Sequence, residues 1–268
     1  MQKLLRPLLI TSLLAVAASQ INAEDKLDAG DKVVRYPFGL SVAGLIQRGS
    51  NDAFFYKLRD AVLSNNLTAG NSVPGIASVR LDPSKIDLAL AADVKAYMVG
   101  DQVGNGKDET YAIGFNPAGP GVTTGDPKLI FPLAQTDGSR RNSTYPLLPG
   151  DYVDLGQFKA GSHLDFFAIA DPNPGYSKKN PEDLAKVFST AAGDQNARMY
   201  ALTGTAYLLV TFEGKDKYGV DYNDVAIAVN VGADNVRRLM GAPEPSLLLA
   251  LGSFAGVLLT VTGRRRQG

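Results

Sequence analysis

The stretch that decides the fold reads Phe212-Glu213-Gly214, a loop over 215–220, Asp221-Tyr222-Asn223-Asp224, and then VAIAVNV over 225–231. In its last part the large apolar residues alternate with small or polar ones, which is the period of a strand with one buried face. We therefore predict a strand over 225–231 that is entered through a polar turn.

The polar turn carries an unusual density of side-chain oxygen atoms. Asp221, Asn223 and Asp224 lie within four residues, and Glu213 lies just across the loop. Calcium prefers about six to eight oxygen ligands and tolerates irregular geometry, so these four residues are a candidate calcium site. Asp and Asn also favour plain turns, because they hydrogen-bond their own backbone. The residues alone leave both interpretations open.

The composition limits the class of protein. The chain has 268 residues, of which 45% are hydrophobic and 20% charged, which favours a well-filled core and argues against wholesale disorder. It has no Cys, so disulfides, thiol nucleophiles and cysteine-based zinc sites are excluded. Apart from its two terminal segments the chain has more acidic than basic residues, which argues against a nucleic acid as the partner.

The N-terminus has the layout of a secretory signal peptide over 1–23. Lys3 and Arg6 form a basic start, an apolar run covers 8–18, and the small residue Ala23 precedes an acidic pair. We expect export and cleavage after Ala23. A buried N-terminal helix is the alternative.

The C-terminus combines three features in order, namely Pro243-Glu244-Pro245, an apolar run over 247–262, and the basic run Arg264, Arg265 and Arg266. At ~1.5 Å per residue a helix over 247–262 is about 24 Å long, slightly less than the ~30 Å of a bilayer core. The arginines are expected to stay on the cytoplasmic side, which places the body outside.

This tail resembles the PEP-CTERM sorting signal of Gram-negative bacteria. The resemblance implies recognition by an exosortase, a membrane transpeptidase, cleavage near the Pro243-Glu244-Pro245 step, and delivery to the cell surface or the extracellular matrix. The alternative is a permanent anchor with one transmembrane helix over 247–262.

Between the two ends we predict one domain, 24–240, that is mainly β. A helix is expected after a cap at Ser50 or Asn51, because apolar residues at 54, 55, 58, 62 and 63 share one side. A second helix is expected over Pro181–Ser189. The predicted strands are 86–99, 110–115, 128–133, 152–158, 163–170, 199–212 and 225–231. Short strands divided by turn residues indicate a β-sandwich, jelly-roll-like in form.

The run from Tyr207 to Glu213, the short loop, and the step from Asp221 to Val225 resemble the end of the domain of unknown function 4114 family of secreted bacterial proteins. The resemblance covers about 86–231 and implies calcium binding. Gly214 and Gly219 stand where the family has carboxylates.

Catalytic motifs are scarce in this chain. His163 is the single histidine, and no Gly-x-Ser-x-Gly elbow accompanies it. Tyr145, Tyr152 and Tyr176 are candidates for a sugar-stacking platform. We expect an exported, non-enzymatic protein of structural or adhesive role, linked to exopolysaccharide or biofilm and stabilised by calcium. The alternatives are a carbohydrate-binding module and a polysaccharide-active hydrolase.

Overall fold

The computed structural model describes residues 40–49, 52–68, 70–101, 111–118, 127–134, 147–170, 187–214 and 220–241. The signal peptide expected over 1–23 and the sorting signal expected over 243–268 lie outside these residues, as do Tyr145 and Tyr176. Among the residues that are described, no helix has the length and apolar character needed to cross a membrane.

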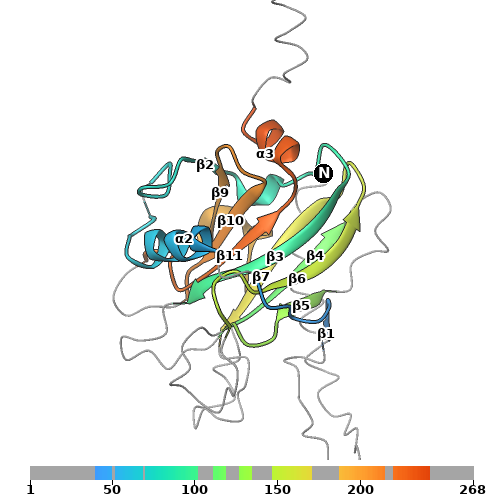
Figure 1. Cartoon of the computed structure of the whole chain (residues 1–268), viewed down its shortest axis with the longest axis horizontal. Coiled ribbons are helices and arrows are strands. Elements are labelled where there is room, and N and C mark those ends of the chain that lie inside the picture. The colour runs from blue at the N-terminus through green and yellow to red at the C-terminus, as the bar shows by residue number, and fades with distance from the viewer. Residues whose placement is uncertain are drawn as a thin grey trace, which may run out of the picture.

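The described strands form two sheets, as the sequence predicted for a β-sandwich (Figure 1). The five-stranded sheet has the order β1 (Ser41–Val42), β5 (Lys128–Phe131), β4 (Tyr111–Ala118), β7 (His163–Ala170), β8 (Val187–Ser189). The six-stranded sheet has the order β2 (Ser78–Leu81), β9 (Ala197–Leu202), β10 (Tyr207–Phe212), β11 (Val225–Asn230), β3 (Ala92–Asp101), β6 (Tyr152–Phe158). Neighbouring strands pair antiparallel except β1 and β5, which are parallel.

The predicted last strand, β11, lies inside the six-stranded sheet between β10 and β3. Its register places Phe212 opposite Val225 and Tyr207 opposite Asn230, so β10 and β11 form a hairpin closed by the polar turn. Val225, Ile227 and Val229 point into the core between the two sheets, so the alternation read from the sequence is confirmed. The expectation of a single buried face is wrong, because Ala226 and Ala228 on the other face are also fully buried, in the cluster that contains α2.

Apolar side chains fill the space between the sheets. Phe131, Phe166 and Phe212 are fully buried there, and each such ring stabilises the fold by about 1.5–3 kcal/mol relative to exposure. This core joins strands from both sheets, so it holds the sandwich together.

A second apolar layer covers the outer face of the six-stranded sheet. Helix α2 (Ala53–Leu63) lies against this face near β10 and β11 (Figure 1) and buries Phe55, Leu58 and Val62. The helix was predicted, but its cap is Asp52, whose side chain accepts a hydrogen bond from the Phe54 N–H at 2.8 Å. The cap predictions at Ser50 and Asn51 were therefore wrong, because Asp52 supplies the same chemistry directly before the first helical residue.

The structure corrects two of the strand boundaries. The strand predicted over 86–99 begins only at Ala92, because Ile86 and Leu88 fill the core through a segment that makes an isolated bridge at Asp87. The strand predicted over 199–212 is two strands, β9 and β10, with a turn between them in which Gly204 has φ +75°. That positive φ is readily adopted only by glycine.

The prediction of a second helix over Pro181–Ser189 is wrong at the C-terminal end of that range. Residues 187–189 form strand β8, which pairs with β7, and Ser189 caps the short 3-10 helix η4 (Thr190–Gln195). Residues 181–186 lie outside the described residues. The prediction missed β1, β2 and the short helix α3 (Ala233–Leu239), which has too few residues to show a clear period.

Candidate metal centre at the β10–β11 turn

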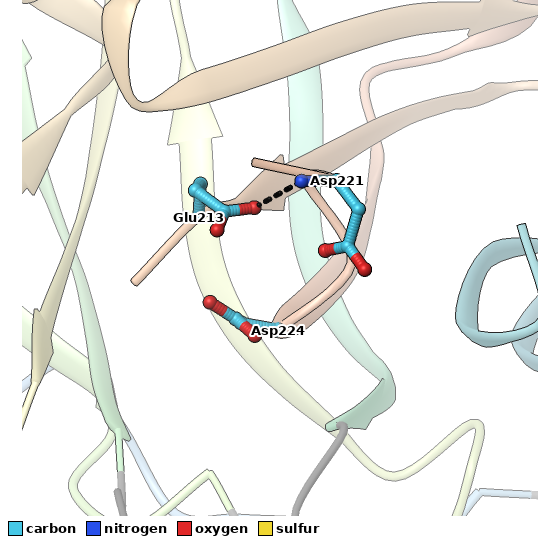
Figure 2. Close-up of side chains that lie close together, drawn as sticks. All are labelled: Glu213, Asp221 and Asp224. Carbon is cyan, nitrogen blue, oxygen red and sulfur yellow. Dashed lines mark hydrogen bonds between the residues drawn. The ribbon is translucent and has the colours of Figure 1, made fainter. Parts of the chain in front are cut away.

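The register of the β10–β11 hairpin brings the predicted site residues together. Phe212 pairs with Val225, so Glu213 and Asp224 directly follow and precede one matched pair of residues. Glu213 and Asp224 are buried and Asp221 is half-buried, and one carboxylate oxygen of each lies within 4.8 Å of those of the other two (Figure 2). Three of the four predicted ligands therefore form one cluster, and Asn223 lies between two of them in the chain.

Backbone N–H groups hold two of these carboxylates in place. Glu213 Oε2 accepts hydrogen bonds from the N–H of Asp221, at 2.9 Å, and from the N–H of Tyr222. Asp224 Oδ2 accepts one from the N–H of Gly214. The turn thus folds around its own carboxylates, which accounts for the compactness of the cluster.

The buried oxygen atoms of this turn that accept no hydrogen bond from the described residues include Glu213 Oε1 and Asn223 Oδ1. Both side chains are only 2% exposed. Leaving a buried polar atom without a partner costs about 1–3 kcal/mol, so each needs an explanation. In Figure 2 the second oxygen of Glu213 points to the side on which Asp224 lies, where an ion shared by the cluster would contact it.

Burial also changes the ionisation of Glu213. It raises the pKa of Glu213 from its ordinary 4.5 to about 7, and the nearby charges of Asp224 and Asp221 act in the same direction. The two backbone hydrogen bonds lower the pKa but do not offset the burial. A divalent cation would remove this penalty, because it favours the ionised form of every carboxylate around it.

Tyr222 has φ +58°, the only non-glycine residue with positive φ in the described part of the chain. This left-handed conformation costs a non-glycine residue about 1–3 kcal/mol and is often found at functional sites. The guanidinium carbon of Arg198 lies 3.5 Å from the centre of the Tyr222 ring, and Arg198 itself is only 6% exposed. This cation–π contact holds Tyr222 in its strained conformation.

Sequence reasoning missed Arg198. Its signal was a single charged residue in the segment ARMYAL, 197–202, whose other members are apolar and buried. A cation inside an otherwise apolar strand requires a specific partner, and here the aromatic ring of the turn provides one.

The donor set suits a hard cation. Two oxygen atoms on opposite sides of one calcium ion are separated by about 4.6–5.2 Å, because each Ca–O distance is about 2.3–2.6 Å. The carboxylate cluster is within this limit, since its oxygens lie within 4.8 Å of one another. Carboxylate and amide oxygens are the ligands that calcium takes, and two of them have no donor among the described residues. The residues present therefore fit the predicted calcium.

The single histidine, His163, pairs with an aspartate from another segment of the chain. It begins β7, is buried, and its Nδ1 lies 2.8 Å from Asp87 Oδ1. Nearby, Asp165 Oδ1 accepts hydrogen bonds from Ser189 Oγ, Thr190 Oγ1 and the N–H of Ala191. Burial raises the pKa of Asp165, and these hydrogen bonds oppose that rise. Ser189 thus donates to the Asp165 carboxylate, and the His163 ring contacts Asp87.

The structure contains an aromatic cluster, of which Tyr152 is the only described member of the predicted platform. Tyr97 stacks on Phe55 at 5.0 Å between ring centres and contacts Tyr152 at 5.2 Å, while Tyr207 stacks on Phe54 at 5.4 Å. Other pairs of this cluster, such as Tyr97 with Tyr207, meet edge to face. The contacts of Phe54 and Phe55 with tyrosines of the sheet attach α2 to it, and the ring of Tyr152 is contacted by Tyr97 and by Lys95.

A shallow cleft of about 370 Å³ lies where β11 leads into α3, and Asp93 and Asp234 are among the residues that line it. Asp93 is exposed, and Asp234 is 61% exposed and forms an ion pair with Arg237. A catalytic acid of a hydrolase needs an environment that keeps its proton near neutral pH, usually burial. Neither carboxylate of this cleft is buried.

Comparisons of this chain with protein-family models, with curated proteins and with solved structures find no match.

Proposed function

We propose that this protein is exported, binds calcium at the β10–β11 turn, and has a structural or adhesive role at the cell surface or in the extracellular matrix of a Gram-negative bacterium. The observation that carries the calcium site is the buried carboxylate cluster with its unpartnered oxygens at Glu213 and Asn223. Calcium bound by Glu213, Asp221, Asn223 and Asp224 would neutralise these groups and close the hairpin that contains the central strand β11.

Export and sorting rest on the two terminal segments. The signal peptide over 1–23 directs the chain out of the cytoplasm, and the tail over 243–268 has the order of parts of a PEP-CTERM signal. An exosortase is then the processing partner, and the apolar run over 247–262 anchors the chain in the membrane until it is cleaved. Exopolysaccharide or biofilm matrix is the environment in which the body acts.

The body is a two-sheet sandwich, and the proposal includes a jelly-roll-like form for it. The passages of the chain from one sheet to the other, from β3 to β4 and from β6 to β7, support that form. The described acidic groups of the cleft are exposed, and the ring of Tyr152 is contacted by Tyr97 and by Lys95. Both observations favour a structural or adhesive protein over a hydrolase or a sugar-stacking module.

The experiment that tests the calcium site is thermal unfolding of the full-length chain in excess chelator and in millimolar calcium. Gly214 and Gly219 stand where the family it resembles has carboxylates, so we expect weak binding, with a dissociation constant of ~10⁻⁴–10⁻³ M as in extracellular calcium-binding modules. Calcium at ten times the dissociation constant should stabilise the fold by about 1.4 kcal/mol. Asp221→Ala should lose this stabilisation. An identical midpoint of wild type in chelator and in calcium would make the cluster an ordinary hydrogen-bonded turn.

A further inference from the structure

The turn that carries the carboxylate cluster is also the attachment point of the loop after α2, residues 65–68. The N–H of Leu67 donates a hydrogen bond to the carbonyl of Asp221 at 2.8 Å. Asn223 Nδ2 donates to the carbonyl of Asn65 at 3.1 Å, and Thr68 Oγ1 donates to the carbonyl of Val220. One short loop thus makes three hydrogen bonds to the four residues 220–223.

Apolar packing continues the same attachment. Leu67 is fully buried in the apolar layer beneath α2, and Tyr222 of the turn belongs to the same cluster. Tyr200 Oη, on β9, donates to the Leu67 carbonyl at 3.3 Å. The end of the outer layer therefore depends on the shape of the β10–β11 turn.

The shape of that turn depends in turn on its carboxylates. Glu213 holds the N–H groups of Asp221 and Tyr222, and Tyr222 is kept at positive φ. Carboxylate oxygens of Glu213, Asp221 and Asp224 lie within 4.8 Å of one another, and repulsion between ionised carboxylates opposes this close approach. A cation bound among them would offset that repulsion, so ion binding would favour the closed form of the turn.

We propose that the cation centre is a latch for the outer helical layer, in which an ion bound between Glu213, Asp221 and Asp224 fastens residues 65–68 to the β10–β11 turn. Removal of the ion frees this loop and the C-terminal end of α2 while the two sheets stay folded. Asn223 transmits the effect, because its amide oxygen lies in the site turn and its amide nitrogen holds the loop. This inference rests on the calcium site proposed above and adds a conformational consequence to it.

In an exported protein the weak calcium affinity would make the latch depend on the calcium level outside the cell. A site with an affinity of ~10⁻⁴–10⁻³ M is empty at the micromolar calcium levels to which cytosolic sensors are tuned and fills in millimolar calcium. The loop after α2 would then dock only after export, and the outer layer would respond to calcium in the surroundings.

Amide hydrogen exchange of the full-length chain, kept in detergent because of its apolar C-terminal run, tests the latch. We expect exchange at Leu67 and its neighbours to slow about tenfold in millimolar calcium relative to chelator, with β7, residues 163–170, unchanged. Equal slowing of the loop and of β7 would overturn the latch, because it would indicate general stabilisation. Calcium binding without any change at residues 65–68 would overturn the latch and leave the site, whereas absence of binding would overturn both.

Two variants separate the coupling from the binding. Asn223→Asp keeps an oxygen ligand but removes the donor to the Asn65 carbonyl, so calcium should bind at least as tightly while the protection of residues 65–68 falls severalfold. Asn235→Asp is the matched control, because Asn235 Nδ2 donates to the carbonyls of Leu90 and Val231 away from this turn. Its calcium-dependent protection at residues 65–68 should equal that of wild type. Full protection of the loop in Asn223→Asp would overturn the assigned role of Asn223.

Discussion

Replacement of Glu213 by Gln tests the electrostatic account of the turn, because it predicts that removing a buried charge stabilises the apo protein. Burial raises the pKa of Glu213 from 4.5 to about 7, so the folded state binds this proton more tightly than the unfolded state between those two values. The stability of the calcium-free wild type should therefore fall as the pH rises from about 4.5 to 7. Above pH 7 the folded state carries the full cost of the ionised carboxylate.

The magnitude follows from the same two pKa values. A difference of about 2.5 pH units corresponds to roughly 3 kcal/mol, which is an upper bound because the two backbone N–H groups bond more strongly to a carboxylate than to an amide. We expect Glu213→Gln to gain about 1–3 kcal/mol over wild type in chelator at pH 8.5. This corresponds to a rise in the melting midpoint of about 2–10 °C for a chain of this size. At pH 5 the gain should fall to about a quarter of this value, because the wild-type side chain is then neutral in the folded state and only its unfolded state is largely ionised.

The assay is thermal unfolding of both proteins at pH 5 and pH 8.5, in chelator and in millimolar calcium. Calcium should raise the wild-type midpoint more than that of Glu213→Gln, whose site has one carboxylate fewer, and so narrow the gap between the two midpoints at pH 8.5. Asp93→Asn, which neutralises an exposed carboxylate, is the control and should stay within about 0.5 kcal/mol of wild type. A Glu213→Gln protein that melts below wild type by the same amount at both pH values would refute the reasoning, since Glu213 would then act only as a hydrogen-bond acceptor.

Three further predictions concern other parts of the chain. Thr190→Val should destabilise the fold by about 1–3 kcal/mol, because the hydroxyl of buried Thr190 donates to Asp165 and accepts from the N–H of Phe166. Chemical denaturation measures this, and an unchanged denaturation midpoint would contradict it. Gly114→Ala should lower the free energy of unfolding by about 3 kcal/mol or more, because the added Cβ would lie 2.2 Å from a Phe167 ring atom and 2.6 Å from the Lys128 carbonyl oxygen. A normally folded variant would show that these strands can separate. Replacement of Pro243, Glu244 and Pro245 by Ala should leave an unprocessed, membrane-bound form. If mass spectrometry shows that the native mature protein still contains residues 264–268, a permanent anchor is favoured instead.

Local sequence patterns were sufficient for elements whose signal is short-range. The alternation over 225–231 predicted a strand, and the apolar spacing over 54–63 predicted α2, because side-chain direction follows from the backbone period. The expectation that only one face of the strand is buried failed, because α2, a distant segment, covers Ala226 and Ala228 on the other face. The same reasoning failed at residues 187–189, where pairing with β7 overrode a helical pattern. It also failed for β2, a four-residue edge strand whose partner β9 is distant in sequence.

For the candidate site, too, some properties follow from the sequence and others only from the tertiary structure. The sequence by itself determined the chemistry of the site, because Asp221, Asn223 and Asp224 are neighbours and Glu213 is only a short loop away. Only the tertiary structure decided that these groups are buried, that Arg198 from β9 lies against Tyr222, and that the loop after α2 is fastened to the turn. The physical reason is that the hydrogen-bonding capacity of a side chain is a property of the residue itself. Its desolvation is not, because segments distant in the chain must cover it. The raised pKa of Glu213 follows from that covering.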